Sequence, residues 1–398
     1  MSEQVAIDGV VELPTERPGR FDPPAELARL RAQHPVTPLR YPDGHVGWLV
    51  TEHAAARAVL SDARFSARLD LKRLPVGPAG SGELQPAPPG YFLGMDPPDH
   101  TRYRKLLAGR FTARRMRELE ERIGEVVDEC LAEMAAAGPP VDLVERFALP
   151  VPSRVMCELL GVPYEDRAHF QSISEALLGF DVARMEAAFG ELNTYLYQLV
   201  QRKRAERPDD LLGELITQTE LEDVELCSIA FLLLVAGHET SANMLGIGTF
   251  ALLANPEQLT ALRADPALLP GAVDELLRYL SIPQYGITRT ALADVELAGR
   301  QVREGDVVTV SVPAVNRDPE RFADPDTLDV TRSAAGHLTF GHGVHQCIGQ
   351  ALALVELRLG FGRLLDRFPT LRLAVPAAEV PMRADRQIYG VHRLPVAW

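Results

Sequence analysis

The segment from Asp223 to Ala254 constrains the fold of this chain more than any other part of the sequence. Placed on a helix, its residues are apolar nearly all round, and such a helix is stable only where it is buried on every side. A chain of 398 residues with 46% hydrophobic content can supply a core large enough to bury it. The segment therefore predicts a sizeable globular protein with one long helix in its interior.

Helical spacing of apolar residues extends well beyond this segment. Apolar residues recur every three or four positions through most of 101–264, and further helices are expected over about 270–280 and 348–368. By contrast, 45–51 and 287–315 have the character of short strands, and the second range also carries turn glycines. The expected fold class is mainly α with a minority of β, without the alternation of strand and helix that builds a parallel sheet.

The expected helices fill the space between candidate domain ends, so we expect a single large helical domain with small β-sheets over 1–398. Its N-terminal part, roughly 1–73, is expected to be β-rich, and the helical core is expected over 100–398. The intervening residues, 74–99, are rich in proline and glycine. This composition fits either a linker between domains or a long loop that covers a site.

The charge and the cysteines restrict the partners and the compartment. The formal net charge of -14 argues against nucleic acid as the main partner. The N-terminus carries no apolar signal segment, and the strongest apolar stretch, 229–237, is shorter than the ~20 residues that a membrane helix needs. Cys130, Cys157, Cys227 and Cys347 form no CxxC pair, which fits neither a disulfide framework nor a cysteine-rich zinc site. We expect a cytoplasmic monomer with no membrane association.

The residues around Cys347 form the clearest candidate functional motif in the sequence. We expect this residue at the start of the last helix, where free backbone N–H groups and the helix dipole stabilise a thiolate. Gly341, Gly343 and Gly349 flank it, and glycines at such spacing allow positive φ and let a flat group approach the backbone. A free cysteine is more often part of a core. The three glycines and His345 favour a metal ligand instead.

The segment FGHGVHQCIG, residues 340–349, resembles the haem-binding loop of the cytochrome P450 family. The resemblance implies the cytochrome P450 fold and haem b (iron protoporphyrin IX) as cofactor, with Cys347 as the metal ligand. In that family the thiolate pushes electron density toward the iron and favours O–O cleavage. The resemblance also implies that Phe340 packs against the thiolate side of the haem and that His345 hydrogen-bonds a propionate.

Two further segments carry the same resemblance. Glu275 and Arg278 lie three apart on one expected helix face, where a surface ion pair is the ordinary interpretation and contributes little. The resemblance implies a buried pair beneath the haem loop, completed by Arg332, with a structural role. In the long helix, Glu239 and Thr240 interrupt the apolar pattern and resemble the family's catalytic acid–alcohol pair, which relays protons to dioxygen. A threonine bonded to a backbone carbonyl would explain Thr240 but not the adjacent carboxylate.

Haem carries two propionates that need cations, and arginine suits carboxylates because its fork is bidentate. His100 and Arg104 resemble the family's HxxxR clamp, and Arg289 matches an arginine on the strand after the ExxR helix. The residues expected to bind the cofactor are His100, Arg104, Ala236, Arg289, Phe340, Gly341, His345, Cys347 and Gly349.

The resemblance implies a haem-thiolate monooxygenase, and the variable parts of the chain point to its substrate. The loop 74–95 and a helical hairpin around 165–200 are expected to cover the distal pocket. Candidate pocket residues are Leu93, Leu233, Ala236, Ile282, Ile287 and Ile388. All are apolar, which predicts a mid-sized hydrophobic substrate such as a polyketide, macrolide, terpenoid or steroid-like molecule. Core packing is the alternative role for each of them.

Electrons are expected from outside, because the chain has no flavin or nicotinamide fingerprint. A ferredoxin with an NAD(P)H-dependent ferredoxin reductase is the expected source. Residues 102–117 contain seven basic residues and no acid. A solvated helix face is the ordinary interpretation of such a run, whereas docking of an acidic ferredoxin is the functional one. The expected docking residues are Arg102, Lys105, Arg110, Arg114 and Arg115.

Three other functions compete with this interpretation. A peroxygenase or dehydrating enzyme would keep the haem and need no external electrons, although the Glu239–Thr240 pair favours dioxygen activation. A haem-binding sensor or carrier would not need that pair. A helical binding protein with an incidental cysteine would contain no haem at all.

Overall fold

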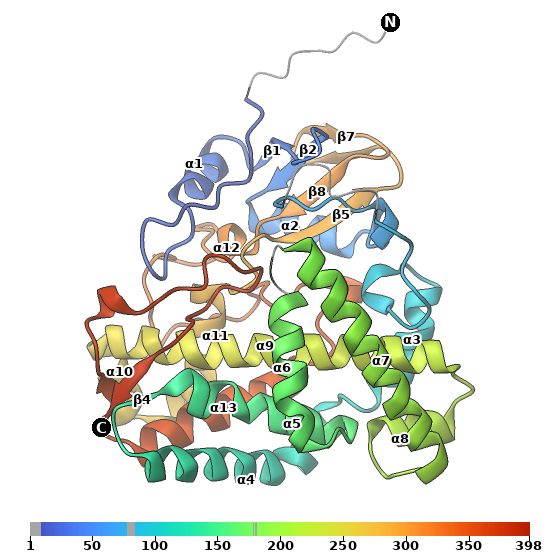
Figure 1. Cartoon of the computed structure of the whole chain (residues 1–398). Helices are drawn as coiled ribbons and strands as arrows, with labels where there is room; N and C mark the ends of the chain where they lie inside the picture. The colour runs from blue at the N-terminus through green and yellow to red at the C-terminus, as the bar shows by residue number, and fades with distance from the viewer. Residues whose placement is uncertain (1–8, 78–83, 178, 180) are drawn as a thin grey trace, which may run out of the picture.

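The computed structural model of the chain describes residues 9–77, 84–177, 179 and 181–398 (Figure 1). Helices dominate and the sheets are small, so the predicted fold class is confirmed. The helices are α1 (Ala25–Gln33), α2 (His53–Ser61), α3 (Asp99–Ala108), α4 (Ala113–Ala137), α5 (Pro150–Leu160), α6 (Arg167–Leu177), α7 (Val182–Glu206), α8 (Leu211–Gln218), α9 (Asp223–Ala254), α10 (Pro256–Ala264), α11 (Leu269–Leu280), α12 (Val312–Val315) and α13 (Gln350–Arg367).

The strands pair across long stretches of sequence. A five-stranded sheet has the order β1-β2-β8-β5-β3, in which β2 and β8 are parallel and the other neighbours antiparallel. A second sheet has the order β4-β10-β9, and β6 pairs with β7. The strands are β1 (Val36–Arg40), β2 (Val46–Val50), β3 (Phe65–Ser66), β4 (Val141–Asp142), β5 (Ile287–Ala291), β6 (Val295–Leu297), β7 (Arg300–Val302), β8 (Val307–Val310), β9 (Arg372–Leu373) and β10 (Pro395–Ala397).

Helix α9 crosses the full width of the molecule below the five-stranded sheet (Figure 1) and packs against α5, α7 and α13. Its bounds are those predicted, and a capping box between Glu222 and Glu225 closes its N-terminus. By length and composition α9 would also pass for a membrane span, which corrects the expectation that no segment would. However, 72% of its most apolar window is buried inside the protein, as in the core helix of a globular fold.

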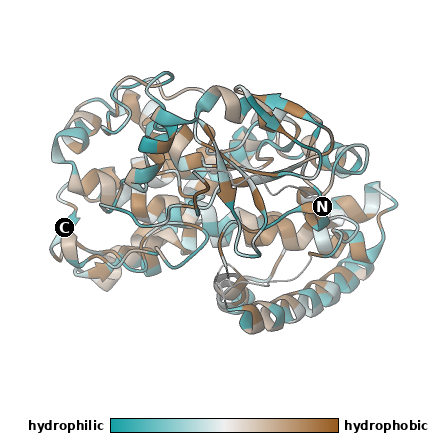
Figure 2. Cartoon of the chain, turned by 90° about the horizontal axis from the view of Figure 1, so that it is seen from above, coloured by the Kyte–Doolittle hydropathy of each residue, from teal (hydrophilic) through white to brown (hydrophobic). Residues whose placement is uncertain are grey.

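Three apolar clusters of buried residues lie in the described part of the chain, and two of them border the loop 340–349. The larger joins the inner faces of α4, α5, α7, α9, α11 and α13, and a smaller one lies between α2 and the five-stranded sheet. Seen from above, hydrophilic and hydrophobic residues alternate along the peripheral helices (Figure 2), as expected for helices that bury one face. Phe340 packs against the larger cluster and Ile287 against the smaller. The loop 340–349 therefore lies where the two clusters meet.

Two predictions of local structure are wrong. Residues 312–315, expected as strand, form the short helix α12, because the Ser311 side chain accepts the backbone N–H of Ala314 and caps a turn. Strand β4 interrupts the region expected to be helical, because it pairs with β10 from the far end of the chain. Pairing over such a distance leaves no periodic signal in the local sequence.

Candidate active site

The loop before α13 has the backbone shape that its glycines allow. Gly341 and Gly343 have φ of 70° and 73°, as predicted, and the backbone N–H of Cys347 donates to the carbonyl of Phe340 at 2.8 Å. A Cβ on Gly343 would lie 2.3 Å from the carbonyl oxygen of Leu60. Only glycine fits there without a shift of the backbone. The loop therefore lies tightly against the end of α2.

The predicted surroundings of Cys347 need two corrections. Helix α13 begins at Gln350, three residues beyond Cys347, and Gly349 is its N-cap with φ of -83° rather than a positive value. The predicted N–H groups are present, because the backbones of Gly349 and Gln350 both hydrogen-bond the sulfur. Burial nevertheless dominates and raises the pKa of the Cys347 thiol, while those N–H groups and Arg104 act to lower it. Cys347 lies among many protein atoms, which desolvate its thiol, yet part of the residue is still reached by solvent.

The four predicted propionate-binding side chains converge beside this loop. The rings of His100 and His345 lie 4.1 Å apart, centroid to centroid. Both ring nitrogens of His100 and Nε2 of His345 are buried without a hydrogen-bond partner. Burial and then Arg289 lower the pKa of His345 to about 2, and burial lowers that of Arg289 to about 10. Asp96 lies nearby, but Ser66 and Ala67 donate to its two oxygens.

Lys72 is a further cation at this place, and no sequence motif marks it. Burial and then Arg289 lower the pKa of Lys72 to about 8. Its neighbour Leu71 is tied to β5, because Thr290 Oγ1 donates to the Leu71 carbonyl at 2.8 Å. Crowded cations and unpartnered buried nitrogens are costly unless an anion compensates them. The cluster therefore fits the two carboxylates of a haem, next to a cysteine that can ligate its iron.

The middle of α9 is accessible on one side only. Val235, Ala236, Gly237 and Thr240 are not buried, whereas their neighbours along the helix are. Thr240 Oγ1 donates to the carbonyl of Ala236 at 2.8 Å, which is the alternative considered from the sequence. The accessible strip lets a bound molecule reach the helix between Ala236 and Thr240.

Glu239 is not the unpaired buried charge that the sequence indicated. Asn243 Nδ2 donates to its Oε2 at 3.0 Å, and the Arg383 guanidinium lies 3.4 Å from the same oxygen. The side chains of Glu239 and Arg383 are 3% and 7% exposed, so this is a buried ion pair. Because the charge is paired, its burial alone does not indicate a functional role for Glu239. Any role for Glu239 has to include these two partners.

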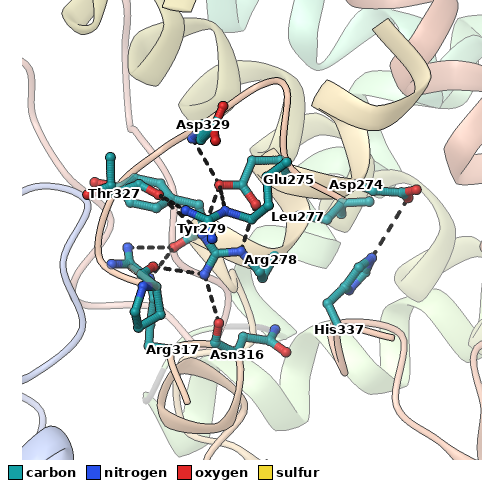
Figure 3. Close-up of polar contacts among 12 residues, drawn as sticks. Asp274, Glu275, Leu277, Arg278, Tyr279, Asn316, Arg317, Thr327, Asp329 and His337 are labelled. Atoms are coloured by element: carbon teal, nitrogen blue, oxygen red, sulfur yellow. Dashed lines mark hydrogen bonds and ion pairs between the residues drawn. The ribbon is translucent and has the colours of Figure 1, made fainter. Parts of the chain in front are cut away.

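The predicted ExxR pair is present and fully buried (Figure 3). Arg278 donates to Glu275 at 2.7 Å, and both side chains are 0% exposed. Arg332 completes the group at 3.2 Å from Glu275, as the resemblance implied. Arg278 also donates to the backbone carbonyls of Asn316 and Pro325 at 2.9 and 2.8 Å. These contacts fix the segment that follows β8 to helix α11.

The candidate pocket residues divide into two groups. Leu233 and Ile282 are 6% and 3% exposed and belong to the hydrophobic core, which was the alternative considered for them. Ala236, Ile287 and Ile388 are more accessible, and Leu93 is 45% exposed. The accessible residues remain candidates for substrate contact.

The basic run 102–117 is partly neutralised by acids from α8 and α9 and by Glu118 of α4 itself. Arg102 pairs with Glu225, and Arg110 pairs with Glu214 at 3.0 Å. Arg114 pairs with Glu118 at 3.1 Å while its side chain stays 85% exposed, and Arg115 lies near Glu118 and Glu214. Lys105 is exposed without an ion pair among the described residues. The uncompensated surface charge is thus smaller than the sequence suggests.

Comparison with known proteins assigns the family. The cytochrome P450 family model matches residues 168–393. The chain is 52% identical to cytochrome P450 105C1 of a Streptomyces species over 98% of both chains, and 45% identical to pentalenic acid synthase of Streptomyces avermitilis over 99% and 98%. Its structure matches that of CYP105P1 in complex with filipin I with a TM-score of 0.93, at 45% identity over 98% and 99% of the two chains. The chain therefore belongs to the cytochrome P450 family of haem-containing monooxygenases.

Proposed function

We propose that this monooxygenase hydroxylates or epoxidises a mid-sized hydrophobic molecule, such as a polyketide, macrolide, terpenoid or steroid-like compound. Its electrons come from a ferredoxin and an NAD(P)H-dependent ferredoxin reductase, and it works as a cytoplasmic monomer. The observation that carries the proposal is the accessible Cys347 beside two buried histidines whose ring nitrogens lack hydrogen-bond partners and which are crowded by the cations Arg104, Arg289 and Lys72.

In this proposal each residue has a defined task at the cofactor. Cys347 ligates the iron, and the N–H groups of Gly349 and Gln350 stabilise its thiolate. His100, Arg104, Arg289 and His345 bind the propionates, and Phe340 packs beside the thiolate. When bound, the haem supplies the centre at which dioxygen is reduced and its O–O bond is cleaved.

Cleavage of dioxygen to a product oxygen and water consumes protons, which the middle of α9 is placed to deliver. Thr240 lies on the accessible strip, and its hydroxyl hydrogen is held by the Ala236 carbonyl. Its oxygen can accept a proton only as the hydroxyl turns from the carbonyl and gives up its own hydrogen, so each transfer leaves Thr240 a neutral alcohol. Glu239, the next residue toward the N-terminus, is the acid that supplies the proton. General acid catalysis of this kind contributes about 10²–10⁴-fold to a rate.

The substrate class rests on the accessible apolar residues and on the relatives. Ala236, Ile287 and Ile388 offer apolar surface beside the site. Among the relatives are a vitamin D3 dihydroxylase of Streptomyces griseolus, at 43% identity, and a mycinamicin VIII methyl hydroxylase of Micromonospora griseorubida, at 36% identity with a TM-score of 0.90. The names of these relatives give vitamin D3 and mycinamicin VIII as what they act on, which supports the same substrate class here. The loop 74–95, of which 78–83 lie outside the described residues, and the α6–α7 pair are the covers of this pocket.

The experiment that tests the function begins with a screen. Purified protein is titrated with polyketides, macrolides, terpenoids and steroids, and the compound with the largest spin-state change becomes the test substrate. We expect a hydroxylated or epoxidised product from dioxygen that requires both ferredoxin and reductase. Equal turnover with hydrogen peroxide alone would identify a peroxygenase, and binding without any product would identify a carrier. Cys347→Ser is expected to abolish the thiolate-type carbon monoxide spectrum.

A further inference from the structure

The carboxylate of Glu239 is held asymmetrically. Both of its hydrogen-bond donors reach the same oxygen: Asn243 Nδ2 at 3.0 Å and the Arg383 guanidinium at 3.4 Å contact Oε2. Asn243 also donates to the backbone carbonyl of Glu239 at 2.8 Å, one turn back along α9. Oε1 has no hydrogen-bond partner within the described part of the chain. One oxygen is therefore fixed by the protein and the other is left free.

Arg383 reaches this oxygen from a hairpin near the end of the chain, residues 382–391. Met382 and Val391 form the bridge that closes the hairpin, and the backbone N–H of Arg383 donates to the carbonyl of Gly390 at 2.9 Å. A Cβ on Gly390 would lie 2.1 Å from Asn243 Oδ1, so the hairpin touches α9 at the residue that also holds Glu239. This close contact fixes the position from which the guanidinium reaches the carboxylate.

The pair is poorly explained as a device for stability. Burying two charges costs more than an apolar pair of similar volume in many proteins. In addition, Arg383 Nε is buried without a hydrogen-bond partner, so the guanidinium is not fully satisfied. A buried group that is incompletely satisfied indicates a constraint other than packing. The constraint that the geometry offers is the orientation of Glu239.

We propose that Arg383 is a positioning residue, which holds Oε2 of Glu239 so that Oε1 stays free to pass protons toward Thr240. The inference rests on the proposed proton-delivery function of Glu239. In each cycle Oε1 takes a proton from solvent and releases it toward the Thr240 hydroxyl, and the charge of Arg383 does not change. Arg383 itself touches neither substrate nor cofactor in this role.

The test is a double-mutant cycle on coupling, measured as product formed per NAD(P)H consumed with the compound selected by the spin-state screen. We expect Arg383→Gln to lower coupling at least about tenfold, with haem content and the carbon monoxide spectrum unchanged. Arg383→Lys, which keeps the positive charge, is expected to recover much of the lost coupling. The decisive variant is Glu239→Gln/Arg383→Gln, which should be no worse than Glu239→Gln alone, because the arginine acts only through the carboxylate.

Two controls separate this role from others. Arg393→Gln changes an exposed arginine of the same C-terminal segment and should leave coupling at the wild-type value. Turnover driven by hydrogen peroxide should persist in Arg383→Gln, since peroxide brings its own protons. Wild-type coupling in Arg383→Gln, or losses that simply multiply in the double variant, would overturn the proposal. A wild-type enzyme that yields no product from dioxygen would instead refute the proposed function.

Discussion

Gly343 shows how a single residue sets the shape of the cofactor loop. Its φ is positive, and a Cβ would lie 2.3 Å from a backbone oxygen that cannot move independently. Gly341 has a similar φ, yet a Cβ there would make only an ordinary contact, at 3.8 Å from Ile287. A side chain at Gly341 would therefore introduce backbone strain alone, whereas a side chain at Gly343 would introduce both strain and a steric clash.

We predict that Gly343→Ala lowers the free energy of unfolding by about 2–3 kcal/mol and speeds haem loss, since strain and a clash add. Gly341→Ala, which adds strain alone, should cost about 1 kcal/mol. Thermal unfolding and haem transfer to apomyoglobin measure both effects. Equal losses in the two variants would contradict the steric argument.

Glu356 is a fully buried acid on α13 that belongs to no recognisable sequence motif. Ser241 donates to one of its oxygens at 2.6 Å, and the other is buried without a partner. Burial raises the pKa of Glu356 to about 8. The folded state therefore keeps a proton that the unfolded chain releases above its ordinary pKa of about 4.3.

It follows that Glu356 destabilises the fold progressively as pH rises from about 5 to about 8. Relative to Glu356→Gln, the wild type should lose about 1.4 kcal/mol per pH unit in this window and nothing further above it. Urea unfolding at successive pH values measures the difference. A difference that is independent of pH would mean that the carboxyl is ionised in the folded protein.

At the scale of elements, the buried Glu275–Arg278 pair joins α11 to the segment after β8. Removing the charge of Glu275 leaves Arg278 buried without its counter-ion, and we predict a loss of about 3–5 kcal/mol for Glu275→Gln. Arg332→Gln should cost less, because Arg332 is 12% exposed and Arg278 still neutralises the glutamate. Thermal unfolding of the two variants provides the comparison. The reverse order would show that Arg332, rather than Arg278, is the main partner.

The elements also show what the sequence can and cannot predict. The bounds of α9 were predicted because apolar residues occur on nearly every face of this segment, which is typical of a buried helix. The contact between Glu275 and Arg278 was predicted because residues three apart on a helix lie on one face, whereas their burial and the part of Arg332 were predicted from the family resemblance. The partner of Glu239 was not, because Arg383 lies 144 residues away and no periodicity connects the two. Lys72 was missed for the same reason, since only the fold brings it beside Arg289.

For the whole molecule, the net charge of -14 repels an acidic electron donor except where basic residues gather on the surface. Four arginines of the basic run are paired with Glu214, Glu225 or Glu118, so steering depends on few charges without an acidic partner. Arg114 stays 85% exposed although it pairs with Glu118, and Lys105 is exposed without an ion pair among the described residues.

We predict that reduction by an acidic ferredoxin slows as ionic strength rises, and that Arg114→Glu slows it several-fold at low salt. Arg263→Glu is the matched control, because Arg263 is exposed on α10, at the opposite end of α9 from α3 (Figure 1). Stopped-flow reduction at increasing salt measures both variants. Identical effects of the two changes would show that only net charge matters and would remove the docking assignment.

The 144 residues that separate Glu239 from Arg383 in the sequence also affect folding during synthesis of the protein. On the ribosome, α9 is synthesised long before the hairpin that carries Arg383. Until that hairpin emerges, the nascent helix is apolar with an acid that lacks its counter-ion, so its final burial is unfavourable. We therefore expect α9 to reach its final packing only after residues 382–391 have been made, and a shortened translation product to leave the apolar surface of α9 open to chaperones.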